Sequence, residues 1–415
     1  MNKNKSFLTI EIVSYYSLLL MAFALPLSRA AISFFILWFF ILVLIKRDYK
    51  SSFNILKENK IFLYLALFFG YIILSLLWTD DYTNAWRHIR LYGYWIIVPC
   101  IVILAKKEWL YKILNAFLLG MFLSEILSYG IFFDLWSFNG RTPEYPTPFM
   151  THIHYSIFLA FTSLVLLYRF LFEKASLRFK ISLFLFFCLT TTNLMISTGR
   201  LGQLAFFITL FFVFIMRYKV SIKSIFLASL LMISIAFISY NGLELFKKRI
   251  DAGFSDVDKI SNNDYDNSFG ARVSWWVITY DALKEKPLFG YGIGSHKVAA
   301  KQMIEKHDYE GLTEQLKVFL YSSHYHNQYL MIVVEGGIIG LFLFLLFIYK
   351  VYRLKIDDLE MKHISIIGIT VCLIGFIAEP LLFLQFPLML FLFILTLSII
   401  GSKDNKKEVK RVNEE

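Results

Sequence analysis

A histidine followed by two amide side chains opens a long apolar run in the last quarter of the chain. The stretch SSHYHNQYLMIVVEGGIIGL, residues 322–341, places His326, Asn327 and Gln328 directly before that run. A neutral imidazole can take a proton from a hydroxyl group, and a helix N-terminus disfavours the imidazolium form. His326 is therefore a candidate general base for activating a hydroxyl nucleophile. An interfacial histidine that only forms hydrogen bonds is the alternative.

One acid and three glycines lie further along the same apolar run. On a helix, Glu335 would point about 180° away from His326, so it cannot orient His326 directly. An acid at that depth in a membrane needs a partner. Glycines allow close approach between helices. We therefore expect a packing role for Glu335 and for Gly336, Gly337 and Gly340.

Two arginines in other segments have side chains suited to phosphate. Arg200 lies in STGRLGQ, between two apolar runs of only roughly 16 residues, or about 24 Å of helix. Because the hydrocarbon core is about 30 Å thick, we expect this turn to dip below the outer surface and face a cavity. Arg272 opens the aromatic stretch ARVSWW. The guanidinium fork binds phosphate well, so two arginines beside His326 predict a pyrophosphate pocket; ion-pair locks are the alternative.

Two His-x-His pairs raise the question of a metal site. They are His152 with His154 and His324 with His326. Helical residues two apart point about 200° apart, so neither pair chelates unless its backbone is extended. The outer carboxylates show no tight ligand spacing either. We expect no metal ion.

The elements that position these residues must be membrane helices. The 415 residues are 58% hydrophobic with a mean hydropathy of +0.60, well above the roughly 45–50% apolar content of soluble proteins. Many runs approach the ~20 apolar residues that cross a bilayer. The prediction is an all-α polytopic membrane protein forming one membrane domain with about twelve spans. We place them at 11–27, 30–45, 61–78, 91–105, 110–133, 151–171, 181–197, 202–216, 224–240, 326–349, 364–380 and 383–400.

Basic residues predict the orientation of the spans. With both termini in the cytoplasm, inside segments carry 26 of the 42 Lys and Arg, including the basic tail at 401–415. The short outside loops carry Arg29, Arg87, Arg90, Arg141 and Arg200. The net charge of +11 then reflects topology and contact with anionic lipid, not a nucleic-acid partner. Cys100, Cys188 and Cys372 all fall inside predicted spans, so no disulfide framework is expected.

Residues 241–325 form a long outside segment between the ninth and tenth spans. Its first part, DAGFSDVDKISNNDYDNSFG, is polar and is expected to be loop. The following stretch spaces Val273, Trp276, Val277, Tyr280 and Leu283 as a helix does and ends at Pro287. That helix could lie on the membrane surface with its aromatic side down, or merely cap the bundle. The alternating glycines of FGYGIGSHK, 289–297, lack the strand that a dinucleotide fingerprint needs and predict a tight turn.

The sequence resembles the O-antigen ligase family at three motifs in the same order. HNQYLMIVVEGGIIG resembles the family's histidine, amide and Gly-x-x-Gly signature, through His326, Gly337 and Gly340. STGRLG resembles its Ser-x-x-Arg turn between spans. SFGARVSWWVITYDALKEKPLFGYGIG resembles its periplasmic segment. The topology is similar too, so the likeness extends over most of the chain.

The resemblance implies a glycosyltransferase of the GT-C type in the bacterial inner membrane, active at the periplasmic face. Such enzymes move a glycan from undecaprenyl diphosphate to a hydroxyl, commonly a sugar of lipid A–core, with inversion and without metal, ATP or cofactor. His326 would be the base, and Arg200 and Arg272 would bind the diphosphate and stabilise its charge as it leaves. Asn327, His324, Arg90 and His154 are possible substrate contacts.

Relatives of this pattern leave other functions open. An O-antigen polymerase and a protein-directed ligase share the histidine and glycine pattern and differ in the acceptor. A transporter or flippase would instead need charges along a path through the membrane. Against transport, the charged outside residues cluster at one face, and Glu335 and Glu379 are the only deep acids expected from the sequence.

Overall fold

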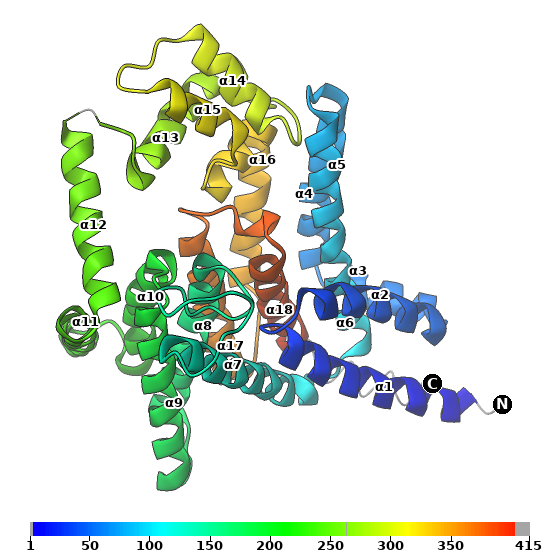
Figure 1. Ribbon diagram of the computed structural model, residues 1–415. Helices are drawn as coiled ribbons and strands as arrows, with labels where there is room; N and C mark the ends of the chain where they lie inside the picture. The colour runs from blue at the N-terminus through cyan, green and yellow to red at the C-terminus, as the bar shows by residue number, and fades with distance from the viewer. Residues whose placement is uncertain (1–2, 263, 403–415) are drawn as a thin grey trace.

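The computed structural model describes residues 3–262 and 264–402, and those residues form helices and connecting segments without a strand (Figure 1). The N-terminal half contains α1 (Lys3–Ala24), α2 (Arg29–Lys46), α3 (Tyr49–Glu58), α4 (Ile61–Leu74), α5 (Tyr82–Tyr92), α6 (Ile97–Leu104), α7 (Leu110–Phe132), α8 (His152–Phe172) and α9 (Leu177–Ile196). The C-terminal half contains α10 (Arg200–Tyr218), α11 (Ile222–Gly242), α12 (Glu244–Ser261), α13 (Ser268–Glu285), α14 (His296–Lys306), α15 (Glu314–Ser322), α16 (Gln328–Tyr352), α17 (Leu359–Gly375) and α18 (Gln385–Gly401).

Helix length and composition confirm a polytopic membrane protein. Within the described residues, nine helical stretches are long and apolar enough to cross a membrane. Two shorter apolar helices, Thr9–Ala24 and Gln385–Gly401, accompany them. Twelve spans and their orientation remain predictions. The predicted basic tail at 403–415 lies outside the described residues.

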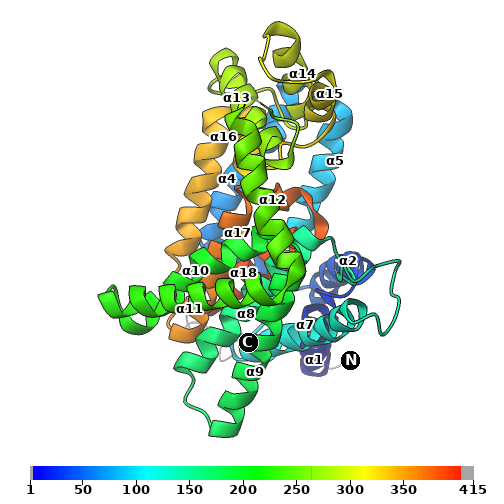
Figure 2. The same cartoon turned by 60° about the vertical axis from the view of Figure 1, so that its left-hand side comes forward.

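The centre of the bundle is built from helices that are apolar on all sides. Every residue of α18 from Phe386 to Gly401 is buried, and nearly all of α8 is buried as well. An all-round apolar helix can lie in a protein core or face lipid, and the burial of α8 and α18 shows that other helices enclose them. In Figures 1 and 2, α4 and α16 rise from this core to the end of the molecule that bears α13, α14 and α15.

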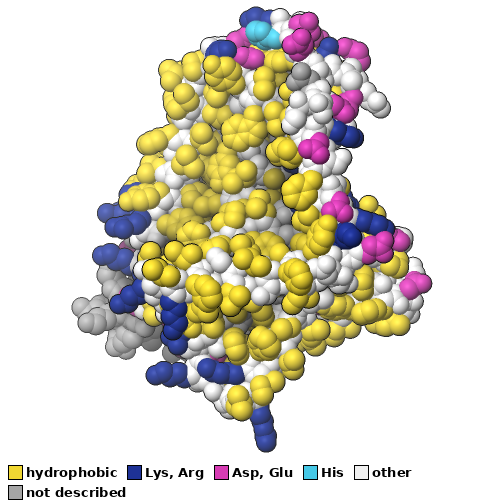
Figure 3. Space-filling view, turned by 90° about the vertical axis from the view of Figure 1, so that its left-hand side faces the viewer, with side chains coloured by type: hydrophobic (Ala, Val, Ile, Leu, Met, Phe, Trp, Pro, Cys, Tyr) yellow, Lys and Arg dark blue, Asp and Glu magenta, His cyan; other side chains and the backbone are white. Residues whose placement is uncertain are grey.

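Side-chain types divide the surface into zones (Figure 3). In that view Lys and Arg dominate the lower end, while Asp and Glu gather at the upper end and along one edge. A broad hydrophobic belt, hollowed in its middle, separates the two ends. This pattern is typical of a protein surrounded by lipid at its waist.

The outer segment forms a small apolar core of its own. Trp275 and Ile278 of α13, Ala299 of α14 and Leu320 of α15 are buried together. Met331 and Val334 of α16 belong to the same cluster, so the outer segment packs directly on the first turns of α16. The predicted helix is present as α13, which ends before Pro287; its exposed face carries Trp276 and Tyr280.

Several expectations about local structure are wrong. The start of the outer segment is helical to Ser261 in α12, because Phe246, Ile250 and Phe254 recur at helical spacing. The loop expected between the spans 61–78 and 91–105, which carries Arg87 and Arg90, is helical from Tyr82 onward, because α5 begins there. The helices flanking Arg200 have 20 and 19 residues, because they continue past the apolar runs into charged residues. Length alone therefore does not place Arg200 below the surface.

A deep acid was missed by the sequence analysis. Glu125 of α7 is 2% exposed, and both its carboxylate oxygens accept from the Thr190 hydroxyl of α9 at 3.0 Å. Glu335 and Glu379 are therefore not the only acids buried in the bundle. This removes one of the two arguments against transport; the clustering of charged outside residues at one face stays a prediction.

Candidate active site

His326 lies just outside α16 in a strained backbone conformation. Its φ is +44°, in the left-handed region that a residue with a Cβ seldom occupies. Asn327 follows as the N-cap, with its side chain accepting from the backbone N–H groups of Tyr329 and Leu330. The strain and the cap turn the chain abruptly from the 323–326 segment into the helix. A residue held in such a conformation needs support from its surroundings, and strain of this kind concentrates at functional sites.

The start of α16 is tied to the segment between α17 and α18. The Asn327 side chain donates to the carbonyl of Ile377 at 2.7 Å. Gln328 donates its backbone N–H to Phe376 at 2.8 Å, and its side-chain oxygen accepts from the backbone of Leu382 at 2.9 Å. Residues 376–382 are thereby fixed beside His326, although they come after α17 in the chain.

That segment brings Glu379 to His326. Nδ1 of His326 is 2.8 Å from Oε2 of Glu379, and Nε2 of His324 is 3.6 Å from Oε1 of the same carboxylate. Burial by itself would raise the pKa of Glu379. The hydrogen bond from His326 and the charges of His326, His324 and His154 together outweigh burial and hold that pKa below its ordinary value. Glu379 is thus an ionised acceptor for Nδ1–H of His326, which leaves Nε2 as the nitrogen that can take a proton.

Aromatic rings and a second imidazole surround His326. The Trp275 ring of α13 lies 5.1 Å from the His326 ring between centroids, and Phe319 of α15 lies 6.4 Å away. The His324 ring is closer still, at 4.2 Å. Burial lowers the pKa of His324 to about 4, although Glu379 opposes this effect. His324 is therefore uncharged near neutral pH and does not repel a proton from His326.

The two predicted arginines come from different helices and act on the same region. Arg200 is the first residue of α10, and its Nη1 is 3.5 Å from Oδ2 of Asp256 in α12. Arg272 of α13 donates through Nη1 to the Ser268 carbonyl at 2.7 Å, and its buried Nε has no partner among the described residues. Burial lowers the pKa of Arg272, the charge of Glu379 opposes this, and the charge of Arg200 adds to it. Arg272 thus lies within electrostatic reach of Glu379, and Arg200 lies within electrostatic reach of Arg272.

Two glycines explain how α10 presents Arg200. A Cβ on Gly199 would lie 2.3 Å from Cβ of Ser156 in α8, and one on Gly202 would lie 2.2 Å from the Ser156 carbonyl oxygen. Real Cβ atoms do not make such contacts, so only glycine allows α10 to start against α8. The Ser156 hydroxyl also accepts from the backbone N–H of Gly202 at 3.1 Å. The start of α10 is therefore held firmly.

The remaining predicted residues divide into two groups. His154 of α8 is buried, its Nδ1 has no partner among the described residues, and its charge acts on Glu379. Asn327 supports the backbone around His326. Arg90 is exposed on α5, on the opposite side of that helix from the buried His88, and no described contact joins it to Glu379. His326, His324, His154 and Arg272 thus all act on Glu379, Arg200 is linked to this group through Arg272, and no described contact links Arg90 to it.

The three glycines of α16 do not share one environment. Gly336 and Gly340 face the Tyr71 ring of α4, which would be 3.3 and 3.2 Å from an added Cβ. Gly337 instead has a φ of +63° and interrupts the helix, with the loop at Leu288 as its neighbour. Close helix packing therefore describes the first two, whereas Gly337 accommodates a loop.

Two groups of side chains have donor atoms close enough to hold a metal ion. One is His324, His326 and Glu379, and the other is the buried set His88, His296 and Glu335. In each group the donor atoms lie within 4.8 Å of one another. The His-x-His pair at 324–326 comes together here because its backbone is not helical. In both groups each imidazole faces a different oxygen of one carboxylate. His88 and His296 both form hydrogen bonds to Glu335, whereas only His326 forms one to Glu379 and His324 lies 3.6 Å from that acid.

Glu379 is the functional candidate that sequence reasoning missed. It was recognised only as a deep acid, since 53 residues separate it from His326 and no spacing rule connects them. The one available signal was an acid directly before Pro380 between two apolar runs, where an irregular segment must expose backbone groups that need partners.

Comparisons with known proteins find relatives over part of this chain. Residues 183–345 match a family model described as O-antigen ligase. A protein named "Putative polysaccharide ligase" from Rickettsia conorii is 38% identical over 97 residues, which are 23% of this chain and 22% of that protein. A protein also named "Putative polysaccharide ligase", from Rickettsia typhi, is 35% identical over 92 residues, which are 22% of this chain and 22% of that protein. An uncharacterised protein from Haemophilus influenzae is 34% identical over 130 residues, or 30% of this chain and 31% of that protein.

These alignments extend over less than a third of the relatives' own lengths. The matched family range begins within α9 and ends within α16. It contains Arg200 of α10, Arg272 of α13 and His326, which directly precedes the N-cap of α16. Residues 183–345 of this chain thus match the O-antigen ligase family.

Proposed function

We propose that this protein is an O-antigen ligase, a glycosyltransferase that moves a glycan from undecaprenyl diphosphate to a sugar hydroxyl of lipid A–core. The reaction takes place at the periplasmic face of the bacterial inner membrane, with both termini in the cytoplasm. It inverts the anomeric configuration and uses neither a metal ion nor another cofactor. The observation that carries this proposal is the pairing of His326 with Glu379, within electrostatic reach of Arg272.

The reaction follows from the tautomer that Glu379 selects. Because Nδ1–H of His326 donates to the carboxylate, Nε2 is free to take the proton of the acceptor hydroxyl. The hydroxyl oxygen forms a bond to the anomeric carbon as the bond from that carbon to the diphosphate oxygen breaks. The electron pair of the broken bond leaves with undecaprenyl diphosphate. A single displacement of this kind inverts the anomeric centre.

The arginines stabilise the negative charge that develops on the departing diphosphate. Arg200 and Arg272 provide fixed guanidinium groups, and a preorganised donor of this type contributes about 10²- to 10³-fold in rate. The diphosphate is already a good leaving group, so the transfer needs no ATP. Positioning and fixed charge are then sufficient for catalysis.

A polymerase or a protein-directed ligase would use the same chemistry with a different acceptor. Deleting the gene in its own host and separating lipopolysaccharide and lipid-linked glycan on gels distinguishes these functions. A ligase predicts long chains on undecaprenyl diphosphate and bare lipid A–core. A core carrying a single repeat unit would instead identify a polymerase, and unchanged lipopolysaccharide would contradict both.

The reaction chemistry is tested by complementing that deletion with variants. We expect His326→Ala to restore no attachment although the protein reaches the membrane. His307→Ala is the matched control, because His307 follows α14 in the outer segment and is exposed. The same variant separates transfer from transport. In a ligase, loss of His326 should abolish glycan transfer and spare movement of the lipid-linked glycan across the membrane. A transporter would not show this pattern.

A further inference from the structure

A loop from the outer segment is inserted into a break in α16. Gly337 has φ +63° and ψ −167°, so the helix is not continuous there. The loop supplies the missing partners: Tyr291 donates to the Val334 carbonyl at 2.8 Å, and Gly292 donates to the Glu335 carbonyl at 2.9 Å. In return the N–H of Ile338 donates to the Pro287 carbonyl at 2.9 Å. Backbone groups freed by a helix break inside a membrane protein must be satisfied in this way.

The insertion is possible only because both backbones lack a Cβ at the crossing. A Cβ on Gly290 would lie 2.5 Å from the Val334 carbonyl oxygen, and one on Gly337 would lie 2.1 Å from the Leu288 carbonyl oxygen. The two glycine-rich stretches, 289–294 and 336–340, are therefore two halves of one junction.

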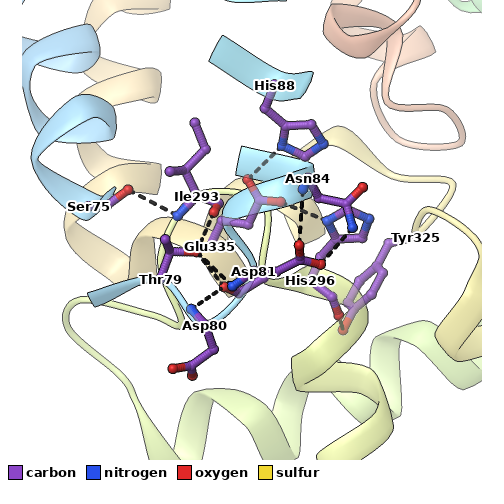
Figure 4. Close-up of polar contacts among 11 residues, drawn as sticks. Ser75, Thr79, Asp80, Asp81, Asn84, His88, Ile293, His296, Tyr325 and Glu335 are labelled. Atoms are coloured by element: carbon purple, nitrogen blue, oxygen red, sulfur yellow. Dashed lines mark hydrogen bonds and ion pairs between the residues drawn. The ribbon is translucent and has the colours of Figure 1, made fainter. Parts of the chain in front are cut away.

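Glu335 lies at this junction, with a buried imidazole on each carboxylate oxygen (Figure 4). Nδ1 of His296, at the start of α14, is 2.8 Å from Oε1. Nδ1 of His88, from α5, is 3.3 Å from Oε2. The two rings are parallel within 9°, with centroids 5.4 Å apart. Glu335 thus joins three elements that are distant in the sequence.

The carboxylate has no other means of balancing its charge among its described contacts. Glu335, His88 and His296 are all 5% exposed or less, and neither Lys nor Arg forms an ion pair with Glu335. A buried charge without a hydrogen-bonded partner is strongly destabilising, so the junction depends on the two imidazoles. Removing the charge of Glu335 weakens the hydrogen bonds that hold the two imidazoles, so the loop then depends on its remaining hydrogen bonds.

A hydrogen bond and ring contacts connect this junction to His326. The hydroxyl of Tyr325 donates to the backbone carbonyl of His296 at 2.9 Å, and Tyr325 is fully buried. Trp275 stacks on the Tyr325 ring with centroids 6.2 Å apart and also lies against His326. Fixing His296 therefore fixes Tyr325, and the next residue in the chain is His326.

We propose that Glu335 is a positioning residue for glycan transfer. Through His88 and His296 it locks the loop at 287–295 into the break in α16, and through Tyr325 that lock sets the place of His326. This inference rests on the proposed function, because it assigns Glu335 to the reaction that His326 performs. Glu335 itself touches no substrate.

The test compares Glu335→Gln with a matched buried acid. The full-length protein is purified in lipid nanodiscs and assayed with a lipid-linked glycan donor and lipid A–core acceptor. We expect Glu335→Gln to lower kcat by about 10- to 100-fold, since small displacements of a catalytic group have effects of that size. The KM for the donor should change by less than about threefold, because Arg200 and Arg272 are untouched. Glu335→Asp, which keeps the charge, should recover part of kcat.

Glu125→Gln is the control, because Glu125 is equally buried but belongs to α7 and contacts Thr190 of α9. Backbone hydrogen exchange gives a second measurement. The amides of Tyr291 and Gly292 should exchange faster in Glu335→Gln and remain protected in Glu125→Gln.

Four results would overturn the inference. They are an unchanged kcat in Glu335→Gln, an equal loss of kcat in Glu125→Gln, unchanged exchange at residues 287–295, or a stoichiometric metal ion in the purified wild type that Glu335→Gln lacks. His326→Ala is assayed beside these variants. If it retains transfer, the proposed function fails; if it is inactive while Glu335→Gln is normal, only the role of Glu335 fails.

Discussion

Nδ1 of His326 lies 2.8 Å from Oε2 of Glu379, although the two residues are 53 positions apart in the chain. The contact joins the segment before α16 to the segment between α17 and α18. It selects one tautomer of the imidazole and aims the other ring nitrogen away from the acid. A hydroxyl-activating base needs this arrangement, because the nitrogen that accepts the proton must be unprotonated and fixed.

Removing the charge of Glu379 should therefore slow the reaction without abolishing donor binding. We expect Glu379→Gln to lower kcat by about 10²- to 10⁴-fold, the range found for loss of general-base function. Steady-state kinetics with the lipid-linked donor would measure it. Asp357→Asn is the control, since Asp357 is 82% exposed before α17, and it should keep the wild-type rate. A Glu379→Gln enzyme within threefold of wild type would show that His326 does not depend on this acid.

The arginines should affect the donor more than the acceptor. We expect Arg200→Gln and Arg272→Gln each to lower kcat/KM for the donor by about 10²- to 10³-fold. Lysine should not fully replace either residue, because it lacks the planar fork that binds two phosphate oxygens. The double variant should lose less than the product of the two single losses if both groups bind one diphosphate.

Arg217→Gln is the matched control for Arg200→Gln, because Arg217 lies at the opposite end of α10. An equal loss of activity in Arg217→Gln would indicate damage to the helix instead of loss of diphosphate binding. Fully multiplicative losses in the double variant would contradict a shared ligand.

His324 should make the folded protein less stable in acid. Burial lowers its pKa from 6.5 to about 4, so the folded state binds fewer protons than the unfolded state between those values. The stabilising contribution is present above pH about 6.5 and is lost as the pH falls toward 4, because protonation then favours the unfolded chain. Thermal melting from pH 4 to 7 should show a shallower loss for His324→Gln than for wild type. If melting temperature falls equally with pH in the two proteins, protonation of His324 does not cause the loss of stability.

Gly337 should be sensitive to a single added methyl group. Gly337→Ala places a Cβ 2.1 Å from the Leu288 carbonyl oxygen in a conformation with positive φ, so we expect a loss of about 2–3 kcal/mol and release of the loop. Gly70→Ala in α4 is the control, because no atom lies within 4 Å of the added Cβ. That variant should be neutral or more stable by up to about 1 kcal/mol. Melting temperatures that move equally would contradict the assignment of Gly337 to the crossing.

The elements that local chemistry controls could be predicted from the sequence. Apolar runs predicted membrane helices, because a helix satisfies its backbone hydrogen bonds internally and lipid offers no partners for them. Pro287 ended α13, and the polar turn near Pro26 separated α1 from α2, because proline lacks a backbone donor. The types of Arg200, Arg272 and His326 indicated phosphate binding and base chemistry before any contact was known. Each of these inferences depends on neighbours within a few residues.

The tertiary structure decided which distant groups meet. Glu379 reaches His326, and His88 and His296 reach Glu335, through helix packing that no spacing rule contains. The exchange of backbone hydrogen bonds at Gly337 also depends on a loop that precedes Gly337 by more than 40 residues. Sequence alone predicted a helical membrane protein and identified His326 as the candidate base. The partner of that histidine depended on the whole fold, since hydrogen bonds and buried charges act over a few ångströms in space regardless of separation in the chain.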